Sequence, residues 1–399
     1  MKYFLLVGEA SGDLHASHLM QQLKKQDSAA SFSGFGGDKM AAEGCRLYCH
    51  IRDLAYMGVV AVLRNADKIR ANFAIAKEKL LSDRPDVLIL VDYPSFNLKM
   101  AEFARKNLPN IRIVYYIPPK VWAWKKWRRK TILKVCDQVL CIFPFEPEFY
   151  GQRGREAEGW KGRKAEVVFV GNPSAEECLT AQRSNSAAVQ QRSGPTAQRS
   201  KIIALLPGSR RSEIANCLPK MIEAARRFPD YEIRISQAPS IPTEFYEQIL
   251  STLNIGTTLH STLSTLNYDL LSQSQVAIVN SGTATLEAAL MGCPQVAVYH
   301  VACPHLLRLI WKAIFTIRHF TLPNIILDKR DEKGRPIEVI RELIADLFTV
   351  EEIVKEVRRL LTDDVYRQTM LADYDAIRHI LGDKKASQEA AHYILNTKH

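Results

Sequence analysis

Short apolar runs alternate with amphipathic helical patterns along most of this chain. The first series of runs comprises Tyr3–Val7, Val87–Val91, Arg112–Ile117 and Gln138–Ile142. A second series comprises Ile202–Leu206, Glu232–Ile235, Val276–Val279 and Gln295–Tyr299. Strands that alternate with helices form parallel sheets, because each crossover helix covers one face of the sheet. The pattern therefore predicts an α/β fold built from two similar halves.

A segment of low complexity separates the two series. Residues 181–200 contain one large apolar residue, Val189, and the pentapeptide TAQRS occurs at Thr180–Ser184 and again at Thr196–Ser200. Such a composition is typical of a flexible linker. We therefore expect an N-terminal domain over residues 1–180, a linker over 181–200 and a second domain over 201–365. Amphipathic helices over residues 366–399 are expected to return to the N-terminal domain.

The composition narrows the class of protein and its surroundings. The chain has 399 residues, of which 24% are charged, and its 54 Lys and Arg against 43 Asp and Glu leave a net charge of +11. This excess favours anionic partners. The eight cysteines form no C-x2-C pair, which favours a reduced, cytoplasmic protein. The apolar run at Tyr3–Val7 is too short for a secretory signal, and the prolines in Ala288–Leu307 disfavour a spanning helix.

Two segments in the N-terminal half follow predicted strands. Gly8–Asp13, with the sequence GEASGD, combines a tight turn with the start of a helix, where free N–H groups can bind an anion or a sugar hydroxyl. Turn geometry alone would also explain it. Asp92 directly follows the apolar run Val87–Val91. Its carboxylate could act as a general base, or it could cap the next helix.

Aromatic, basic and apolar residues gather in two further segments. Residues 120–130 interleave three of the five tryptophans with six basic residues. This combination of residues could bind a phosphate-rich ligand, a lipid headgroup surface or single-stranded nucleic acid. A basic helix whose tryptophans are anchored in the core would explain it as well. The apolar run over residues 56–63, followed by basic residues, fits an interfacial element or a buried helix.

In the C-terminal half, two strand ends carry groups suited to phosphate. The Gly208 and Ser209 amides and the Arg210 guanidinium follow Ile202–Leu206 and could hold a diphosphate. The absence of a P-loop lysine argues against an NTPase. After the second strand, residues 281–283 read Ser-Gly-Thr at a helix start, where the dipole favours pyrophosphate. Glu287 could then bind ribose hydroxyls, or it could close a capping box.

Ten short motifs, in a constant order, resemble one family closely: the lipid A disaccharide synthases, which are nucleotide-sugar glycosyltransferases. The motifs are GEASGD (Gly8–Asp13), AEGC (Ala42–Cys45), MG (Met57–Gly58), DYPSFN (Asp92–Asn97), PKVWAW (Pro119–Trp124), PFE (Pro144–Glu146), VGNP (Val170–Pro173), LLPGSRRSEI (Leu205–Ile214), SGTATLEAAL (Ser281–Leu290) and LPN (Leu322–Asn324). The resemblance implies the GT-B architecture, in which two Rossmann-like domains face a cleft and C-terminal helices pack back on the N-terminal domain.

The resemblance also implies a reaction. The 6-hydroxyl of 2,3-diacylglucosamine 1-phosphate attacks the anomeric carbon of UDP-2,3-diacylglucosamine with inversion, giving a β-1,6-linked disaccharide 1-phosphate and UDP. Asp92 is the expected general base, with Glu9 in reserve. The expected donor-binding residues are Gly208, Ser209, Arg210, Ser281, Gly282, Thr283, Glu287 and Asn324. The expected acceptor-binding residues are Ser11, Gly12, Asn97, Lys120 and Trp122.

Because both reactants carry acyl chains, the N-terminal half is expected to face a membrane. We expect Met57, Val59, Val60, Val62 and Leu63 to face the membrane, with peripheral association at the anionic inner-membrane surface. The family suggests a homodimer. No cofactor, metal or nucleic-acid partner is expected, and the D-x-D sequence at Asp373 and Asp375 is predicted to lie on a solvated helix.

Three alternatives stay open at this point. Two are enzymes of the same architecture: a UDP-sugar epimerase and a transferase with a soluble acceptor, which would have little use for an apolar segment at residues 56–63. The third is a basic nucleic-acid-binding protein, which would need neither Arg210 nor Glu287 and would show a steep salt dependence of binding.

Overall fold

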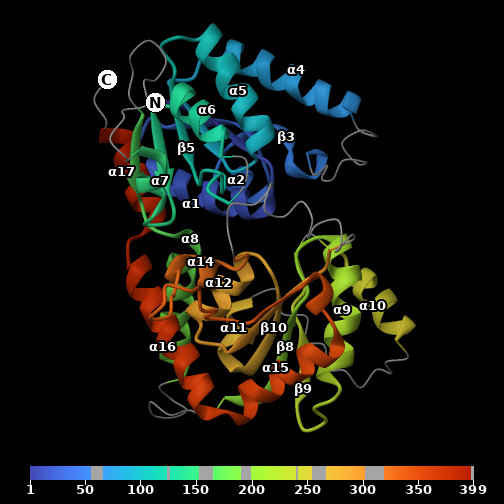
Figure 1. The fold of residues 1–399 in the computed structure, drawn as a ribbon. Coiled ribbons are helices and arrows are strands. Elements are labelled where there is room, and N and C mark those ends of the chain that lie inside the picture. Colours follow the sequence, from blue (N-terminus) through green and yellow to red (C-terminus); the bar gives the residue numbers. More distant parts are fainter. Residues whose placement is uncertain are drawn as a thin grey trace. The chain divides into compact units, whose positions relative to one another are not determined.

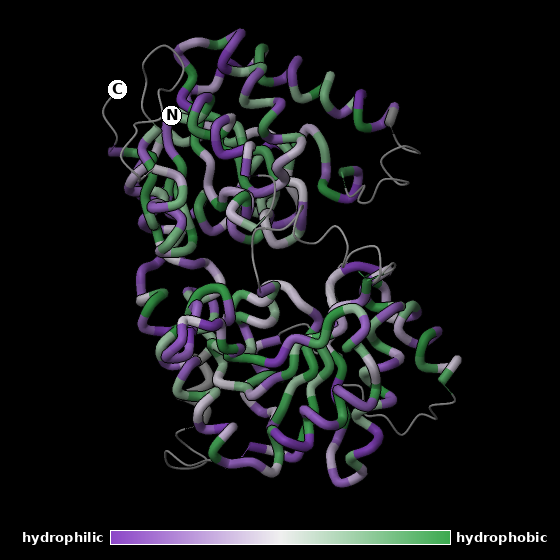
Figure 2. The backbone as a smooth tube through the Cα atoms, in the orientation of Figure 1, coloured by the Kyte–Doolittle hydropathy of each residue, from purple (hydrophilic) through white to green (hydrophobic). Residues whose placement is uncertain are grey.

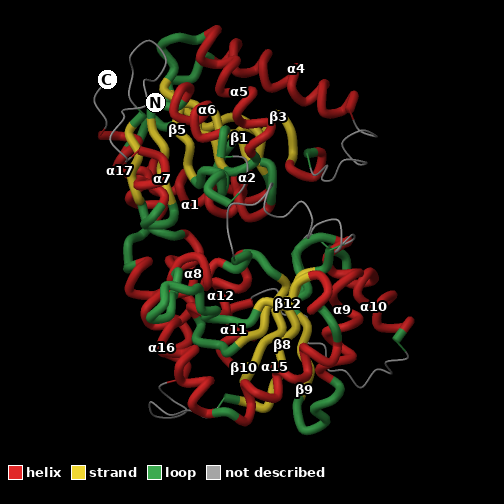
Figure 3. The backbone as a smooth tube through the Cα atoms, viewed as in Figure 1, coloured by secondary structure: helices red, strands yellow, loops and turns green. Residues whose placement is uncertain are grey.

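The computed structural model describes residues 1–54, 66–123, 126–151, 165–189, 199–239, 241–253, 267–301 and 319–396. The chain divides into two compact units (Figure 1). Unit 1 comprises Met1–Pro173 and Lys384–His399, and unit 2 comprises Ser174–Asp383. Each unit contains one parallel sheet with helices packed on its faces (Figure 3).

Unit 1 has a seven-stranded sheet in the order β3-β2-β1-β4-β5-β6-β7. The strands are β1 (Lys2–Val7), β2 (Ser31–Gly36), β3 (Arg46–His50), β4 (Val87–Val91), β5 (Arg112–Tyr116), β6 (Gln138–Cys141) and β7 (Glu166–Phe169). The helices are α1 (Ala10–Gln26), α2 (Asp38–Ala42), α4 (Ala66–Asp83), α5 (Pro94–Asn107), α6 (Arg128–Val135), α7 (Glu146–Gly151) and α17 (Ala386–Asn396), with a 3-10 turn η1 (Ile51–Asp53). The strand order reverses between β1 and β4. Ligands of open α/β sheets bind at such switch points, beyond the carboxyl ends of the strands.

The apolar sequence of the central strands reflects burial on both faces of the sheet. In β1, Phe4 and Leu6 join the core beneath α4, α5 and α6, whereas Tyr3, Leu5 and Val7 join the core beneath α1 and α17. Alternate residues of a strand point to opposite faces, so a strand covered on both sides must be apolar throughout. Figure 2 shows such hydrophobic strands in the interior of each unit.

Unit 2 has a five-stranded sheet in the order β12-β11-β10-β8-β9. The strands are β8 (Ser200–Leu206), β9 (Glu232–Ile235), β10 (Ser274–Asn280), β11 (Gln295–Tyr299) and β12 (Glu342–Ile344). The helices are α8 (Pro173–Val189), α9 (Arg211–Ala225), α10 (Thr243–Thr252), α11 (Asn267–Gln273), α12 (Thr283–Leu290), α14 (Leu322–Leu327), α15 (Val350–Thr362) and α16 (Asp364–Leu381), with a 3-10 turn η3 (Ala345–Leu347). Here the order reverses between β8 and β10, which pair in parallel with Leu206 opposite Val279. The turns after these two strands therefore lie side by side.

Three expected boundaries are corrected. The N-terminal part of unit 1 ends at Pro173 and not at residue 180, because helix α8 belongs to unit 2. Residues 181–189 continue helix α8 instead of beginning a linker, because alanine, glutamine and arginine are good helix formers despite the low complexity of the segment. The returning segment begins at Lys384 and not at residue 366. Helix α16 stays in unit 2, where Met370, Tyr374, Ile377 and Leu381 are buried, and only α17 packs against α1 in unit 1.

The membrane-facing prediction falls on residues that the structure does not describe. Met57, Val59, Val60, Val62 and Leu63 all lie between the described ranges 1–54 and 66–123. Among the described residues, no helix combines the length and the apolar character needed to cross a bilayer.

Candidate active site

The turn after β4 has an unusual backbone. Asp92 and Tyr93 both adopt left-handed conformations, with φ of 44° and 46°, and Ile117 at the end of β5 does the same with φ of 58°. The Asp92 amide donates to the Ile117 carbonyl at 3.2 Å, so the three residues lie together. A left-handed residue other than glycine costs about 1–2 kcal/mol, and such strain persists only where its surroundings hold it.

Two buried side chains hold this turn in place. Asn97 Nδ2 donates to the Asp92 carbonyl at 2.7 Å and to the Leu6 and Val91 carbonyls at 3.2 Å each. The Tyr115 hydroxyl donates to the same Asp92 carbonyl at 2.8 Å. Burial holds the pKa of Tyr115 well above its ordinary value, so the hydroxyl keeps its proton and remains a donor. Asn97, expected to bind the acceptor, is fully buried and instead fixes the turn that carries Asp92.

The surroundings of the Asp92 side chain bear on its two proposed roles. Tyr93, and not Asp92, occupies the N-cap position of α5. The Asp92 side chain is half-buried. Lys120 is a charged neighbour: burial lowers the pKa of its ammonium group, and the negative charges of Asp92 and Glu146 oppose that shift. Lys120 therefore lies within electrostatic reach of the predicted base.

Trp122 is anchored in the core rather than presented to a ligand. Its side chain is buried, and its indole Nε1 donates to Glu146 Oε1 at 2.9 Å. Glu146 Oε2 accepts from the amides of Ile142 and Phe143, each at 3.0 Å. Burial raises the pKa of Glu146 to about 7, and the hydrogen bonds from Trp122 and the two amides oppose the rise. Trp122 is therefore anchored in the core, which is the second of the two alternatives that the sequence left open for residues 120–130. Its buried position does not fit the expected contact with the acceptor. Sequence reasoning assigned no role to Glu146, although the motif PFE contains it.

The GEASGD segment divides into exposed and structural residues. Glu9 occupies the N-cap position of α1 in an extended conformation, and Ser11 is exposed in the first turn. Gly12 is buried against Val7. The buried Asp13 accepts from the amides of residues 37, 39 and 40 at 2.7, 3.0 and 3.1 Å, which joins α1 to the start of α2. Glu9 is half-buried and Ser11 is exposed, whereas Gly12 and Asp13 serve the fold.

The turn after β8 places three predicted donor-binding residues together. Gly208 has φ of 115°, which favours glycine, and it leads into the exposed residues Ser209 and Arg210. The carboxylate of Glu213, in the first turn of α9, accepts from the Ser209 amide at 3.2 Å and from Arg210 Nη1 at 2.8 Å. Sequence reasoning quoted Glu213 within its motif but did not predict this contact.

The neighbouring turn after β10 opens α12. The Ser281 amide donates to the Val298 carbonyl at 2.9 Å, Gly282 is the N-cap residue, and Thr283 is exposed at the first helical position. A capping box needs its acid at the third helical position. Glu287 is the fifth residue of α12, so that alternative does not apply. Its Oε2 accepts from Asn267 Nδ2 at 3.1 Å.

Asn324 is a structural residue and does not fit the donor-binding role. It is fully buried, and its Nδ2 donates to the Ile340 carbonyl at 3.0 Å and to Glu342 Oε1 at 2.8 Å. Its Oδ1 accepts from the amides of Val339 and Ile340 at 2.7 and 2.9 Å. The side-chain amide of Asn324 thus uses both of its donor hydrogens and both of its acceptor sites to hold the residues that lead into β12.

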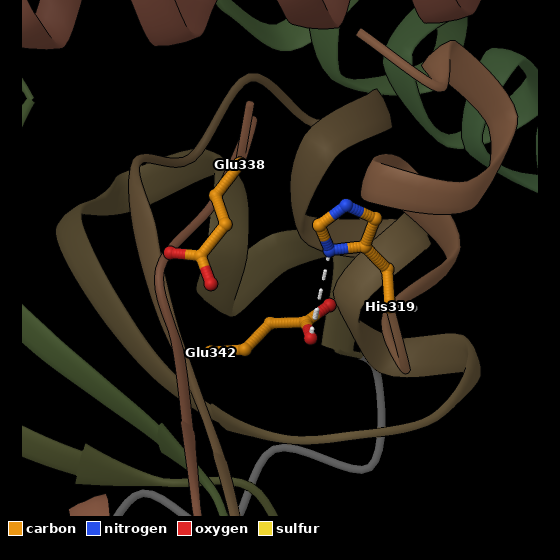
Figure 4. A group of neighbouring side chains, drawn as sticks. All are labelled: His319, Glu338 and Glu342. Carbon is orange, nitrogen blue, oxygen red and sulfur yellow. Dashed lines mark ion pairs between the residues drawn. The ribbon is translucent and has the colours of Figure 1, made fainter. Parts of the chain in front are cut away.

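His319, Glu338 and Glu342 form a group in which one potential metal-ligand atom from each side chain lies within 4.8 Å of the others (Figure 4). The Glu342 carboxylate already accepts hydrogen bonds from the protein, however. Its Oε1 accepts from the Thr321 amide at 2.9 Å, the Thr321 hydroxyl at 2.6 Å and Asn324 at 2.8 Å. These bonds explain the buried carboxylate without a metal ion.

The D-x-D aspartates both form ion pairs within unit 2. Asp373 accepts from Lys329 Nζ at 2.8 Å, and Asp375 pairs with Arg378 on the same helix. Lys329 lies in the segment between α14 and β12, so the first of these pairs attaches that segment to α16.

Comparison with known proteins identifies the family. A family model described as lipid-A-disaccharide synthetase matches residues 3–393. The lipid-A-disaccharide synthase of Geobacter sulfurreducens is 31% identical over 398 residues, covering 99% of this chain and 96% of that protein. That of Nitrosococcus oceani is 35% identical over 379 residues, covering 95% and 92%. The chain belongs to the lipid-A-disaccharide synthetase family. It is accordingly a glycosyltransferase that forms the lipid A disaccharide.

Solved structures support the architecture of this family member. A UDP-GlcNAc 2-epimerase from Neisseria meningitidis, solved with UDP-GlcNAc bound, superposes with a TM-score of 0.64 at 12% identity, over all of both chains. The calicheamicin glycosyltransferase CalG4 gives 0.55 at 13% identity, over 99% of this chain and 98% of its own. At such identities the likeness concerns the fold alone, which comprises two Rossmann-like domains of the GT-B class.

A substitution at Gly8 tests whether the Asp92 turn matters to this enzyme. A Cβ added to Gly8 would overlap the ring of Tyr93, which is stacked on Phe96 and donates to the Leu54 carbonyl at 3.3 Å. We expect Gly8→Ala to displace Tyr93 with Asp92 and to lower kcat at least tenfold, since small misplacements of reacting groups cost about a hundredfold.

The control for Gly8→Ala is Gly151→Ala at the end of α7, where an added Cβ has no atom within 4 Å. Turnover assays on both variants, with thermal unfolding to check their folding, decide the matter. Wild-type kcat in a folded Gly8→Ala variant would show that the position of Tyr93 has no effect on turnover.

Proposed function

We propose that the enzyme transfers 2,3-diacylglucosamine from UDP to the 6-hydroxyl of 2,3-diacylglucosamine 1-phosphate. The products are a β-1,6-linked disaccharide 1-phosphate and UDP, and the anomeric carbon is inverted. The observation that carries the proposal is the pair of adjacent turns after β8 and β10 in unit 2. One offers the Ser209 amide and Arg210, and the other offers the start of α12.

These two turns suit the diphosphate of a nucleotide sugar. Gly208 has no side chain, which lets an anion approach the backbone closely. Arg210 supplies paired donors for phosphate oxygens, and the amides of Gly282 and Thr283 lie at the positive end of the α12 dipole, next to Ser281, whose own amide is bonded to the Val298 carbonyl. These groups stabilise the charge that collects on UDP as it leaves. We assign Glu287 to the ribose hydroxyls. Asn324 serves this site only indirectly, through the fold around β12.

Unit 1 is assigned to the acceptor. We propose that the Asp92 carboxylate takes the proton of the 6-hydroxyl while that oxygen attacks the anomeric carbon on the face opposite the departing diphosphate. An α-linked donor then gives a β-linked product. Lys120 and the exposed Ser11 are available to bind acceptor phosphate and hydroxyls, with Glu9 as the alternative base.

Because both proposed substrates carry acyl chains, the enzyme must reach them at a bilayer. Trp127 is 64% exposed, and Arg128 lies over its ring at 5.5 Å in a stretch rich in arginine and lysine. Exposed tryptophan among cations suits an anionic lipid surface. We therefore propose peripheral association with the cytoplasmic face of the inner membrane, with residues 57–63 as a second contact. A homodimer is proposed from the family resemblance, and no nucleic-acid partner is proposed.

An assay with purified enzyme tests this function. UDP-2,3-diacylglucosamine and 2,3-diacylglucosamine 1-phosphate are supplied in mixed micelles, and the products are separated by thin-layer chromatography. We expect an acylated disaccharide 1-phosphate and one UDP for each bond formed. Reaction of UDP-N-acetylglucosamine alone, with no product from the acylated pair, would reject the proposed substrates in favour of an epimerase-like activity.

A further inference from the structure

Glu213 contacts the same groups to which the proposed function assigns the diphosphate. Its two carboxylate oxygens accept separately from the Ser209 amide and from Arg210 Nη1. We propose that Glu213 is an internal substitute for the diphosphate, which occupies the turn after β8 in the nucleotide-free enzyme and is displaced when the UDP-sugar binds. This inference rests on the proposed function, because it concerns the same turn.

The position of the carboxylate supports displacement rather than simultaneous binding. A Cβ built on Gly208 would lie 2.6 Å from Glu213 Oε2 and 2.7 Å from Asn280 Nδ2. Glu213 therefore fills the space directly over the glycine, which is the space that a phosphate needs to reach the backbone. The Asn280 amide group borders the same space, and its Oδ1 faces the other way, toward the Cys217 thiol at 3.6 Å.

The charges at this turn also favour displacement of Glu213 over simultaneous binding. Arg210 is the charged donor that Glu213 now occupies, together with the neutral Ser209 amide, and like charges a few ångströms apart repel strongly at a partly buried site. Glu213 is 19% exposed in its side chain. Burial raises the pKa of the Tyr299 phenol at the end of β11, the negative charge of Glu213 adds to the rise, and Arg210 opposes it. A diphosphate and the Glu213 carboxylate therefore compete for the same donors.

Displacement leaves Glu213 in a favourable place. It is the third residue of α9, and a carboxylate in the first turn of a helix is stabilised by the dipole even without a specific hydrogen bond. Before binding, the carboxylate keeps the donors of an exposed turn paired and ordered, so the site is formed in advance. After transfer, its return to Ser209 and Arg210 speeds the departure of UDP.

Binding of UDP to the full-length enzyme, measured by titration calorimetry, tests the proposal by the sign of the change. Glu213→Gln removes the competing charge and keeps the shape, so we expect UDP to bind about three- to tenfold more tightly, which corresponds to about 0.7–1.4 kcal/mol. Stopped-flow measurement should show slower UDP release. The matched control is Glu352→Gln, which removes the third-position carboxylate of α15, a group that faces Lys355 at 3.8 Å instead. It should leave UDP affinity unchanged.

Each outcome is decisive. Unchanged or weaker UDP binding by a folded Glu213→Gln variant would overturn the inference and leave the proposed function intact, because wild type still binds UDP. Binding by the variant alone would support the inference. Failure of both proteins to bind UDP would overturn the inference together with the donor site. If Glu213→Gln does not fold, Glu213→Asp replaces it: the shorter side chain cannot reach both donors, and tighter binding is again expected.

Discussion

Asp92→Asn is expected to lower kcat by about 10²- to 10⁴-fold, the usual contribution of a general base. The substitution keeps the size of the side chain and removes the group that accepts the proton. Asparagine also tolerates the left-handed backbone that residue 92 adopts, so the turn held by Asn97 and Tyr115 should persist. UDP affinity should stay within about twofold of wild type, because the loss concerns the transition state and not donor binding.

Turnover assays and UDP calorimetry on the same preparation measure the two quantities for Asp92→Asn. Glu9→Gln is the matched control, since it neutralises the other carboxylate beside the carboxyl end of the sheet. We expect it to have the smaller effect on kcat. If Glu9→Gln loses turnover while Asp92→Asn retains more than a tenth of it, the base is Glu9. If Asp92→Asn weakens UDP binding as much as it lowers turnover, Asp92 has a structural role.

Asn324→Ala is expected to destabilise the enzyme by about 2–4 kcal/mol, because each buried polar group left without a partner costs about 1–3 kcal/mol. Alanine leaves the amides of Val339 and Ile340, the Ile340 carbonyl and Glu342 without the partner that they now share. For a unit of this size the melting temperature should fall by roughly 10 °C. UDP affinity of the folded fraction at low temperature should change little.

Thermal unfolding of the full chain measures the effect of Asn324→Ala. The control is Asn107→Ala, which removes an exposed side-chain hydrogen bond to the Phe103 carbonyl and should shift the midpoint only slightly. The opposite pattern, a normal melting temperature with greatly weakened UDP binding, would restore Asn324 to the donor site and contradict the structural role.

The predicted strands agree best with the structure where burial is complete. The apolar run predicted at Val87–Val91 is β4 with the same bounds, and Ile202–Leu206 lies within β8. Sequence periodicity missed β2, whose sequence SFSGFG is rich in glycine and serine, and three of the four edge strands, β3, β7 and β12, whereas the fourth, β9, has the predicted bounds Glu232–Ile235. Edge strands bury less surface, so their sequences carry a weaker apolar signal.

By itself, the sequence determined the α/β class, the order of the motifs and the family, because these depend on local composition and spacing. It also selected Asp92 and Arg210, whose charges mark turns after buried strands. The tertiary structure decided which motif residues serve the fold. Asn97, Trp122 and Asn324 have the polarity of ligand-binding residues, but each is used by a partner distant in the chain. A motif records the residue types and not the direction of the side chains, and that direction depends on which strands and helices pack together.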